Sequence, residues 1–156
     1  MIRYDLAPDV AARIQQITKL LEFTHIDPER VICMRSHGST SQTTLARCHA
    51  LPKIMQLALG QRPAYVVEIL AETFDRLPEG EQTKTLIHEL MHIPRNFGGG
   101  FRNHRPHVTR RRVDRMYEAY RRATERAGPA REKPALVNAV GGKAGARQTQ
   151  SRTEEG

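Results

Sequence analysis

The sequence predicts an α+β fold in which a small, mostly antiparallel sheet packs against helices. Three observations support this fold. Segments with apolar residues at helical intervals are interspersed with short runs rich in β-branched residues. A length of 156 residues with 38% hydrophobic content suits a single domain with one core. The apolar run at residues 85–93, which contains two histidines and a glutamate, is predicted to be the central helix.

The first half of the chain contains two predicted helices and two predicted strands. The first helix is expected over residues 8–22, where apolar side chains recur at helical spacing at Val10, Ile14, Ile17 and Leu21. Residues 30–35 and 43–49 are predicted to be the strands of a hairpin, joined by a polar loop. Residues 52–60 are predicted to form a short helix closed by Gly60.

Cys33 and Cys48 are too few to form the disulfide framework of a small secreted protein. We expect them to be reduced and packed, although across the predicted hairpin they could also face each other as a disulfide or as part of a second metal site. No apolar stretch is long enough to cross a bilayer, and the first residues lack the apolar run of a signal peptide. The expected compartment is therefore the cytoplasm, with no membrane partner.

The pentapeptide His88-Glu89-Leu90-Met91-His92 gives the central helix a candidate chemistry. Residues four apart lie on the same face of a helix, so both imidazoles can reach one metal ion. Neutral imidazole suits zinc, and a catalytic zinc typically has three protein ligands and leaves its fourth position to water. Glu89 is then placed to accept a proton from that water. The alternative is an ordinary core helix, but buried polar groups without partners are costly.

A third ligand is expected soon after this helix, which the following proline should end at about residue 93. Three glycines at 98–100 allow the chain to turn back, and two further histidines follow them. His104 is the favoured ligand. His107 is the alternative, and the histidine that does not bind metal could donate a hydrogen bond to the oxyanion. A last alternative is an acidic ligand from the next helix, at Asp114 or Glu118.

The run from His88 to His104 resembles the metallopeptidase family found in phages and archaea, which is similar in turn to SprT-like zincins. The resemblance covers roughly residues 1–125 and includes four upstream segments, at 35–39, 44–47, 64–68 and 74–77. It implies a single zincin-like domain in which one zinc ion is bound by His88, His92 and His104. It also implies that Glu89, in this HExxH motif, is the general base.

Residues 64–70 form the best strand candidate, just before the central helix. In zincins, as the resemblance implies, an edge strand beside the catalytic helix can pair with an extended substrate through main-chain hydrogen bonds. The strand at 64–70 could have this role. The alternative is that it is an ordinary strand of the core.

The net charge of +8 is concentrated after the central helix. Residues 1–94 contain 10 Lys and Arg residues against 11 Asp and Glu, whereas residues 95–128 contain 10 against 3. A basic segment of this kind can attract nucleic acid or an acidic partner, and the alternative is a solvated helix face. The candidate contacts lie near a helix start, where cations oppose the helix dipole, at Arg110, Arg111 and Arg112.

The last helix is expected over residues 109–126, with Thr109 as its N-cap. One face carries apolar and aromatic side chains, at Val113, Met116, Tyr117 and Tyr120, and such a face usually packs on the core. Tyr117 is also a candidate to stabilise the charge on a tetrahedral intermediate. Residues 1–127 are expected to form the domain. Residues 128–156, which are poor in apolar residues, are expected to be a disordered tail.

The sequence therefore predicts a zinc-dependent metallopeptidase with one zinc ion per chain and a protein or peptide substrate. The rival hypothesis is a non-catalytic, zinc-stabilised module that binds nucleic acid through helix 109–126. The two differ in Glu89: the first requires its carboxylate for turnover, whereas the second requires only the basic side chains and predicts salt-sensitive binding.

Overall fold

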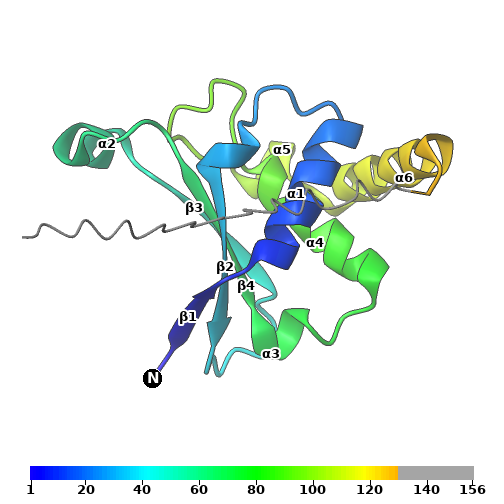
Figure 1. The fold of residues 1–156 in the computed structure, drawn as a ribbon, viewed down its shortest axis with the longest axis horizontal. Helices are drawn as coiled ribbons and strands as arrows, with labels where there is room; N and C mark the ends of the chain where they lie inside the picture. The colour runs from blue at the N-terminus through cyan, green and yellow to red at the C-terminus, as the bar shows by residue number, and fades with distance from the viewer. Residues whose placement is uncertain (130–156) are drawn as a thin grey trace, which may run out of the picture.

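The sheet of the computed structural model has four strands in the order β1-β2-β4-β3 (Figure 1). The structure describes residues 1–129. The strands are β1 (Arg3–Leu6), β2 (Val31–His37), β3 (Ala46–Ala50) and β4 (Tyr65–Leu70). The central pair, β2 and β4, is parallel, and the two outer pairs are antiparallel. The sheet is therefore mixed, with antiparallel pairing at both sides.

The predicted hairpin of residues 30–35 and 43–49 is wrong, although both segments contain strands. β4 lies between β2 and β3 and pairs with each of them. The physical reason is burial: β4 is the most apolar strand, and Tyr65, Val67 and Ile69 are each 0% exposed in the central position. Cys33 of β2 and Cys48 of β3 are both paired with Val67, one on each side of β4. The two free thiols are therefore separated by a strand.

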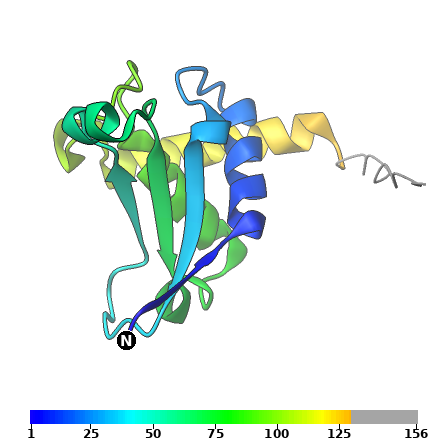
Figure 2. The same ribbon diagram turned by 60° about the vertical axis from the view of Figure 1, so that its left-hand side comes forward.

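The helices other than α2 lie on one face of this sheet and leave the other open (Figure 2). They are α1 (Pro8–Leu20), the 3₁₀ turn η1 (Pro28–Arg30), α2 (Lys53–Leu59), α3 (Ala71–Phe74), α4 (Glu79–Met91), α5 (His104–His107) and α6 (Arg110–Ala127). The central helix α4 packs between β3 and α6, and α1 packs on β2 and α6. Within residues 1–129, no helix combines the length and the apolar character that a membrane span requires.

Local signals in the sequence account for several of these boundaries. Gly60 ends α2 in the left-handed conformation, with φ of 62°, as the glycine at that position predicted. The Thr109 hydroxyl accepts a hydrogen bond from the Arg112 N–H and caps α6. The expected disordered tail starts at Gly128 and almost all of it lies outside the described residues.

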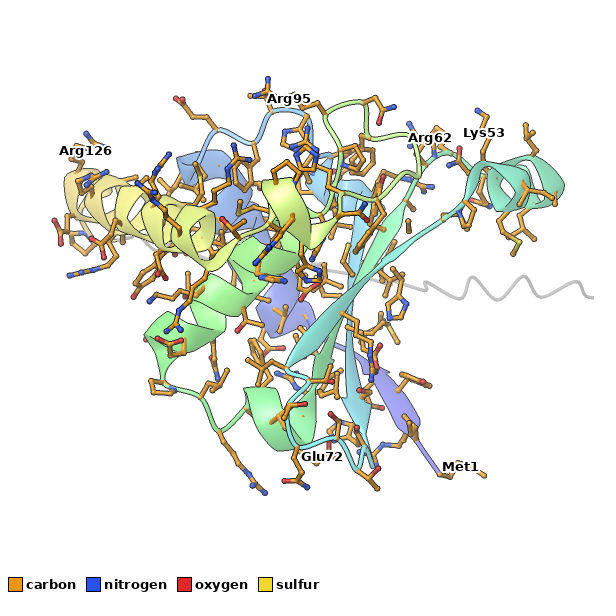
Figure 3. All side chains as sticks on the ribbon, turned by 180° about the vertical axis from the view of Figure 1, so that it is seen from behind. Met1, Lys53, Arg62, Glu72, Arg95 and Arg126 are labelled. Carbon is orange, nitrogen blue, oxygen red and sulfur yellow. The ribbon has the colours of Figure 1, made fainter. Side chains whose placement is uncertain are left out.

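The core lies between the sheet and the helices. From α4 it contains Leu86, Ile87 and Leu90, all 0% exposed. Burial of this kind contributes about 25 cal/mol per Å² of apolar surface, so the apolar face of α4 fixes the helix against the sheet. By contrast α2 projects from the body, and its Lys53 and the Arg126 end of α6 lie at opposite ends of the molecule (Figure 3).

Candidate metal centre

Three histidines converge at the C-terminal end of α4. His88 and His92 lie one helical turn apart, and their Nε2 atoms are 3.2 Å from each other. The chain that follows α4 turns back and brings His104 to the same point, so that one ring nitrogen from each histidine lies within 4.8 Å of the others. Among the described residues, this is the group of donors that could hold a metal ion.

The donor set fits zinc. Tetrahedral zinc with Zn–N distances of about 2.0–2.1 Å separates its ligand nitrogens by about 3.3 Å, close to the separation of His88 and His92. Burial, helped by the other two imidazoles, lowers the pKa of His88 to about 4. Burial also lowers the pKa of His92. Both rings are therefore neutral at physiological pH, which is the form that binds metal.

The orientation of His92 is set by the returning chain. Its Nδ1 donates a hydrogen bond to the carbonyl oxygen of Arg102 over 2.6 Å, which leaves Nε2 for a metal ion. The ring of Phe101 stacks on the imidazole, with centroids 4.4 Å apart and planes 10° apart. The loop therefore positions His92 as well as supplying His104, the third histidine of the group.

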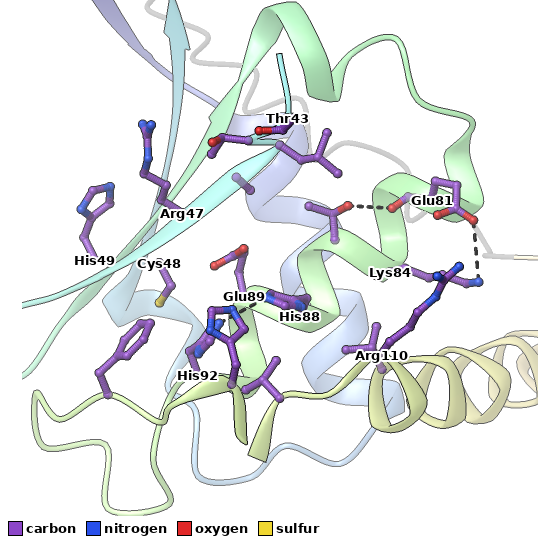
Figure 4. A pocket seen from close by; sticks show the side chains of 18 of the residues that line it. Thr43, Arg47, Cys48, His49, Glu81, Lys84, His88, Glu89, His92 and Arg110 are labelled. Atoms are coloured by element: carbon purple, nitrogen blue, oxygen red, sulfur yellow. Dashed lines mark hydrogen bonds and ion pairs between the residues drawn. The ribbon is translucent and has the colours of Figure 1, made fainter. Parts of the chain in front are cut away.

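Glu89 is a buried carboxylate beside the histidines and is not part of their donor group. It is 6% exposed, and burial raises its pKa to about 7, against a smaller lowering by a hydrogen bond from the Cys48 backbone. Figure 4 shows its side chain directed from α4 toward β3, while His88 and His92 lie together below it. A carboxylate with this pKa can accept and release a proton near neutral pH.

The backbone contact to Glu89 comes from the free edge of β3. Leu45 and Leu51, which flank the strand, form backbone hydrogen bonds with β4. Because alternate residues of an edge strand point their N–H and C=O groups outward, Ala46, Cys48 and Ala50 direct theirs away from β4. Of the two roles considered for residues 64–70, the substrate-pairing edge strand is therefore wrong and the core strand is correct: β4 is paired on both sides, and the edge beside α4 belongs to β3.

The histidines and Glu89 line a cavity of about 860 Å³ between β3, α4 and the start of α6, which we call the metal cavity. Its wall includes polar and charged side chains at its ends, at Thr43, Glu81, Lys84 and Arg110 (Figure 4). A cavity of this size, open along a strand edge, can accept several residues of an extended chain.

The other candidate ligands lie elsewhere. His107 lines a separate cavity. Asp114 is at the edge of the metal cavity, but its carboxylate is 3.3 Å from the Lys84 ammonium, and Glu118 pairs with Arg121. The structure does not bring Tyr117 to the histidines. Its hydroxyl lies against Gly80 at the start of α4, with the Lys84 ammonium 5.2 Å above its ring.

The three consecutive arginines do not form one surface. Arg110 lines the metal cavity, Arg112 borders the cavity that contains His107, and Arg111 lines neither. Helix α6 itself packs on the core through Val113. The structure therefore gives no support to the rival hypothesis of a nucleic-acid module that uses these arginines together.

Two features of the site were not predicted from the sequence: the Phe101 stack on His92 and the Cys48 backbone contact to Glu89. The strand β1, at the opposite edge of the sheet, was not predicted either. An aromatic residue three positions before the third histidine is a usable signal for the stack. The Cys48 contact has no such signal, because it depends on which strand forms the edge of the sheet.

The comparison with known families agrees with this geometry. The family model described as "Putative phage metallopeptidase" matches residues 2–140. No curated protein and no solved structure matches the chain. Because the family model spans most of the sequence, including all four residues of the candidate centre, the chain belongs to the phage metallopeptidase family.

Proposed function

We propose that this protein is a zinc-dependent peptidase in which His88, His92 and His104 bind one zinc ion and Glu89 is the general base. The observation that carries the proposal is the convergence of three imidazoles beside a buried carboxylate that is not among their donors. Membership of a metallopeptidase family supports the same reaction class. The HExxH motif and the single domain are consistent with the zincin-like fold that the sequence resembles.

The donor set suggests which step the metal ion and which step Glu89 would assist. A bound zinc ion would polarise the scissile carbonyl and lower the pKa of water. Glu89 accepts the proton from the attacking water and then donates it to the leaving amine, for which a pKa of about 7 is well matched. The hydrogen bond that the His92 Nδ1 donates to the Arg102 carbonyl oxygen keeps that imidazole in one orientation during the reaction.

The substrate we propose is an extended segment of protein or peptide. The free edge of β3 runs along the cavity past Glu89, and its outward backbone groups at Ala46 and Ala50 are suited to pair with an added strand. Main-chain pairing of this kind depends little on substrate sequence.

A cleavage assay on an unfolded protein substrate tests the proposal. The purified chain should cleave it after zinc is added, should lose activity with a chelator, and should regain activity when zinc is restored. Zinc binding without cleavage of any of several unfolded substrates, in a chain shown to be folded, would contradict the peptidase assignment.

A further inference from the structure

A second cavity, of about 450 Å³, lies on another face of α4 from the metal centre. Its apolar floor is formed by Leu90 and Met91 at the end of α4 and by Ile93 just after it. The segment after α1, which includes Phe23 and His25, forms one side. The chain after α4 and the first turns of α6 form the rest.

The rim of this cavity is strongly basic. Four arginines line it, Arg95, Arg102, Arg112 and Arg115, together with His25 and His107, and the one acidic side chain in the lining is Glu22. Among residues 1–129, none of the four arginines lies within ion-pair distance of a carboxylate. In the same part of the chain, the Arg112 guanidinium donates a hydrogen bond to the His107 carbonyl oxygen, at 3.4 Å.

Some basic side chains elsewhere in the molecule do have carboxylate partners. Arg35, for example, is neutralised by Asp9 and Asp75, at 2.9 and 3.3 Å. Guanidinium groups that share one cavity without counter-charges repel each other, and an anion relieves this repulsion. The positive charge of these arginines affects a neighbouring side chain, because burial and the charges of Arg102 and Arg95 lower the pKa of His25.

We propose that this cavity binds phosphate groups, either of a nucleic-acid backbone or of a free phosphate compound. A guanidinium donates two parallel hydrogen bonds to phosphate oxygens, and several arginines around one cavity match a group or chain of groups that carries more than one negative charge. A single carboxylate would neutralise one of the four cations. The site does not depend on the proposed peptidase reaction.

The cavity shares a wall with the metal centre. Within residues 101–108, Phe101, His104 and Val108 line the metal cavity, whereas Arg102 and His107 line the basic one. The Arg102 backbone also holds His92. A phosphate that engages the Arg102 side chain would therefore restrain the segment that carries the third histidine.

Binding of a labelled single-stranded oligonucleotide and of inorganic pyrophosphate, measured on the full chain, tests the proposal. The pocket variant is Arg95→Gln with Arg115→Gln. The matched control is Arg122→Gln with Arg126→Gln, which removes the same charge from residues that do not line the cavity, Arg126 being at the far end of α6 (Figure 3). We expect the pocket variant to weaken binding about 10-fold or more and to reduce the salt slope by about one per lost contact. The control should change affinity less than about twofold.

The two ligands distinguish the source of the phosphate. Pyrophosphate that binds and displaces the oligonucleotide assigns the cavity to phosphate groups in general, and oligonucleotide binding that pyrophosphate cannot displace assigns it to a nucleic-acid backbone. In either case, backbone amide signals of residues 101–108 should shift on titration of wild type and not of the pocket variant. Equal losses in pocket and control variants, or no binding of either ligand to wild type, would overturn the proposal. Neither readout requires peptide hydrolysis, so the result is independent of the proposed function.

Discussion

His92 and Arg102 are joined by two hydrogen bonds that run in opposite directions. The His92 Nδ1 donates to the Arg102 carbonyl over 2.6 Å, and the Arg102 N–H donates to the His92 carbonyl over 2.7 Å. The end of α4 and the chain that follows the glycines are thus held together at a candidate metal ligand. Because His104 is two residues further along, the same contact also sets the position of the third histidine.

Removal of the third histidine should abolish metal binding. We expect His104→Ala to lose most of the zinc, because it leaves two ligands, and His107→Ala to retain about one zinc per chain, because its ring lines the other cavity. Metal analysis by mass spectrometry after purification without added metal checks both. Zinc loss in His107→Ala with retention in His104→Ala would reverse the assignment.

Replacement of Glu89 should separate metal binding from turnover. Glu89→Gln keeps the side-chain shape and removes the proton acceptor, so zinc content should stay unchanged while kcat falls about 100-fold to 10,000-fold. Glu81→Gln is the matched control, since this residue lies on the same helix and lines the same cavity but pairs with Lys84. A Glu89→Gln protein as active as wild type would exclude Glu89 as the base.

The glycine turn before His104 should tolerate no side chain at Gly99. Its φ is +99°, and a Cβ there would collide with the Gln56 side chain and the Leu51 carbonyl. Gly99→Ala should lower the free energy of unfolding by about 2–4 kcal/mol. At Gly60 the φ is +62° and an added Cβ would have no atom within 4 Å. Gly60→Ala should therefore lower the free energy of unfolding by about 1 kcal/mol. Urea unfolding measures both, and equal losses would show that the close approach at Gly99 is unimportant.

Proline substitutions in β3 should distinguish its two edges. Ala46→Pro removes an outward N–H, so the fold should persist while KM for a peptide substrate rises several-fold. Arg47→Pro removes an N–H that pairs with β4 and should destabilise the domain by about 3 kcal/mol. Thermal unfolding and steady-state kinetics provide the two readouts. An unchanged KM in a folded Ala46→Pro protein would argue against strand pairing with substrate.

The Arg35–Asp9 ion pair should contribute stability that depends on pH. Both guanidinium NH groups of Arg35 donate to the Asp9 carboxylate, at 3.0 and 2.9 Å, and this lowers the pKa of Asp9 below its usual 3.8. The contribution is therefore complete above pH 3.8 and is lost as the pH falls through the lower folded-state pKa. For an exposed pair we expect Asp9→Asn to cost about 0.5–1 kcal/mol at about pH 6 and less at about pH 2.5.

Urea unfolding at both pH values measures this difference. Glu125→Gln is the control, since no ion pair of its carboxylate occurs within residues 1–129 and its cost should not change with pH. A pH-independent loss in Asp9→Asn would show that the pair does not act through its charge.

Short-range features of this protein were correctly predicted from the sequence. The two histidines of the pentapeptide share a face because an α-helix repeats every 3.6 residues, and the Gly60 and Thr109 boundaries follow from the preferences of single residues. The helical periodicity in residues 8–22 likewise placed α1. Each of these depends on atoms a few residues apart in the chain.

Only the tertiary structure decided the order of the strands, and much of the site depends on it. Insertion of β4 between β2 and β3 made β3 the edge that meets Glu89, separated the two cysteines, and overturned the predicted hairpin. Strand order is set by how much apolar surface the whole sheet can bury, which no short stretch of sequence encodes. The sequence likewise showed how many arginines follow α4. Only the packing of α6 and of the chain after α4 showed which of these arginines share a cavity.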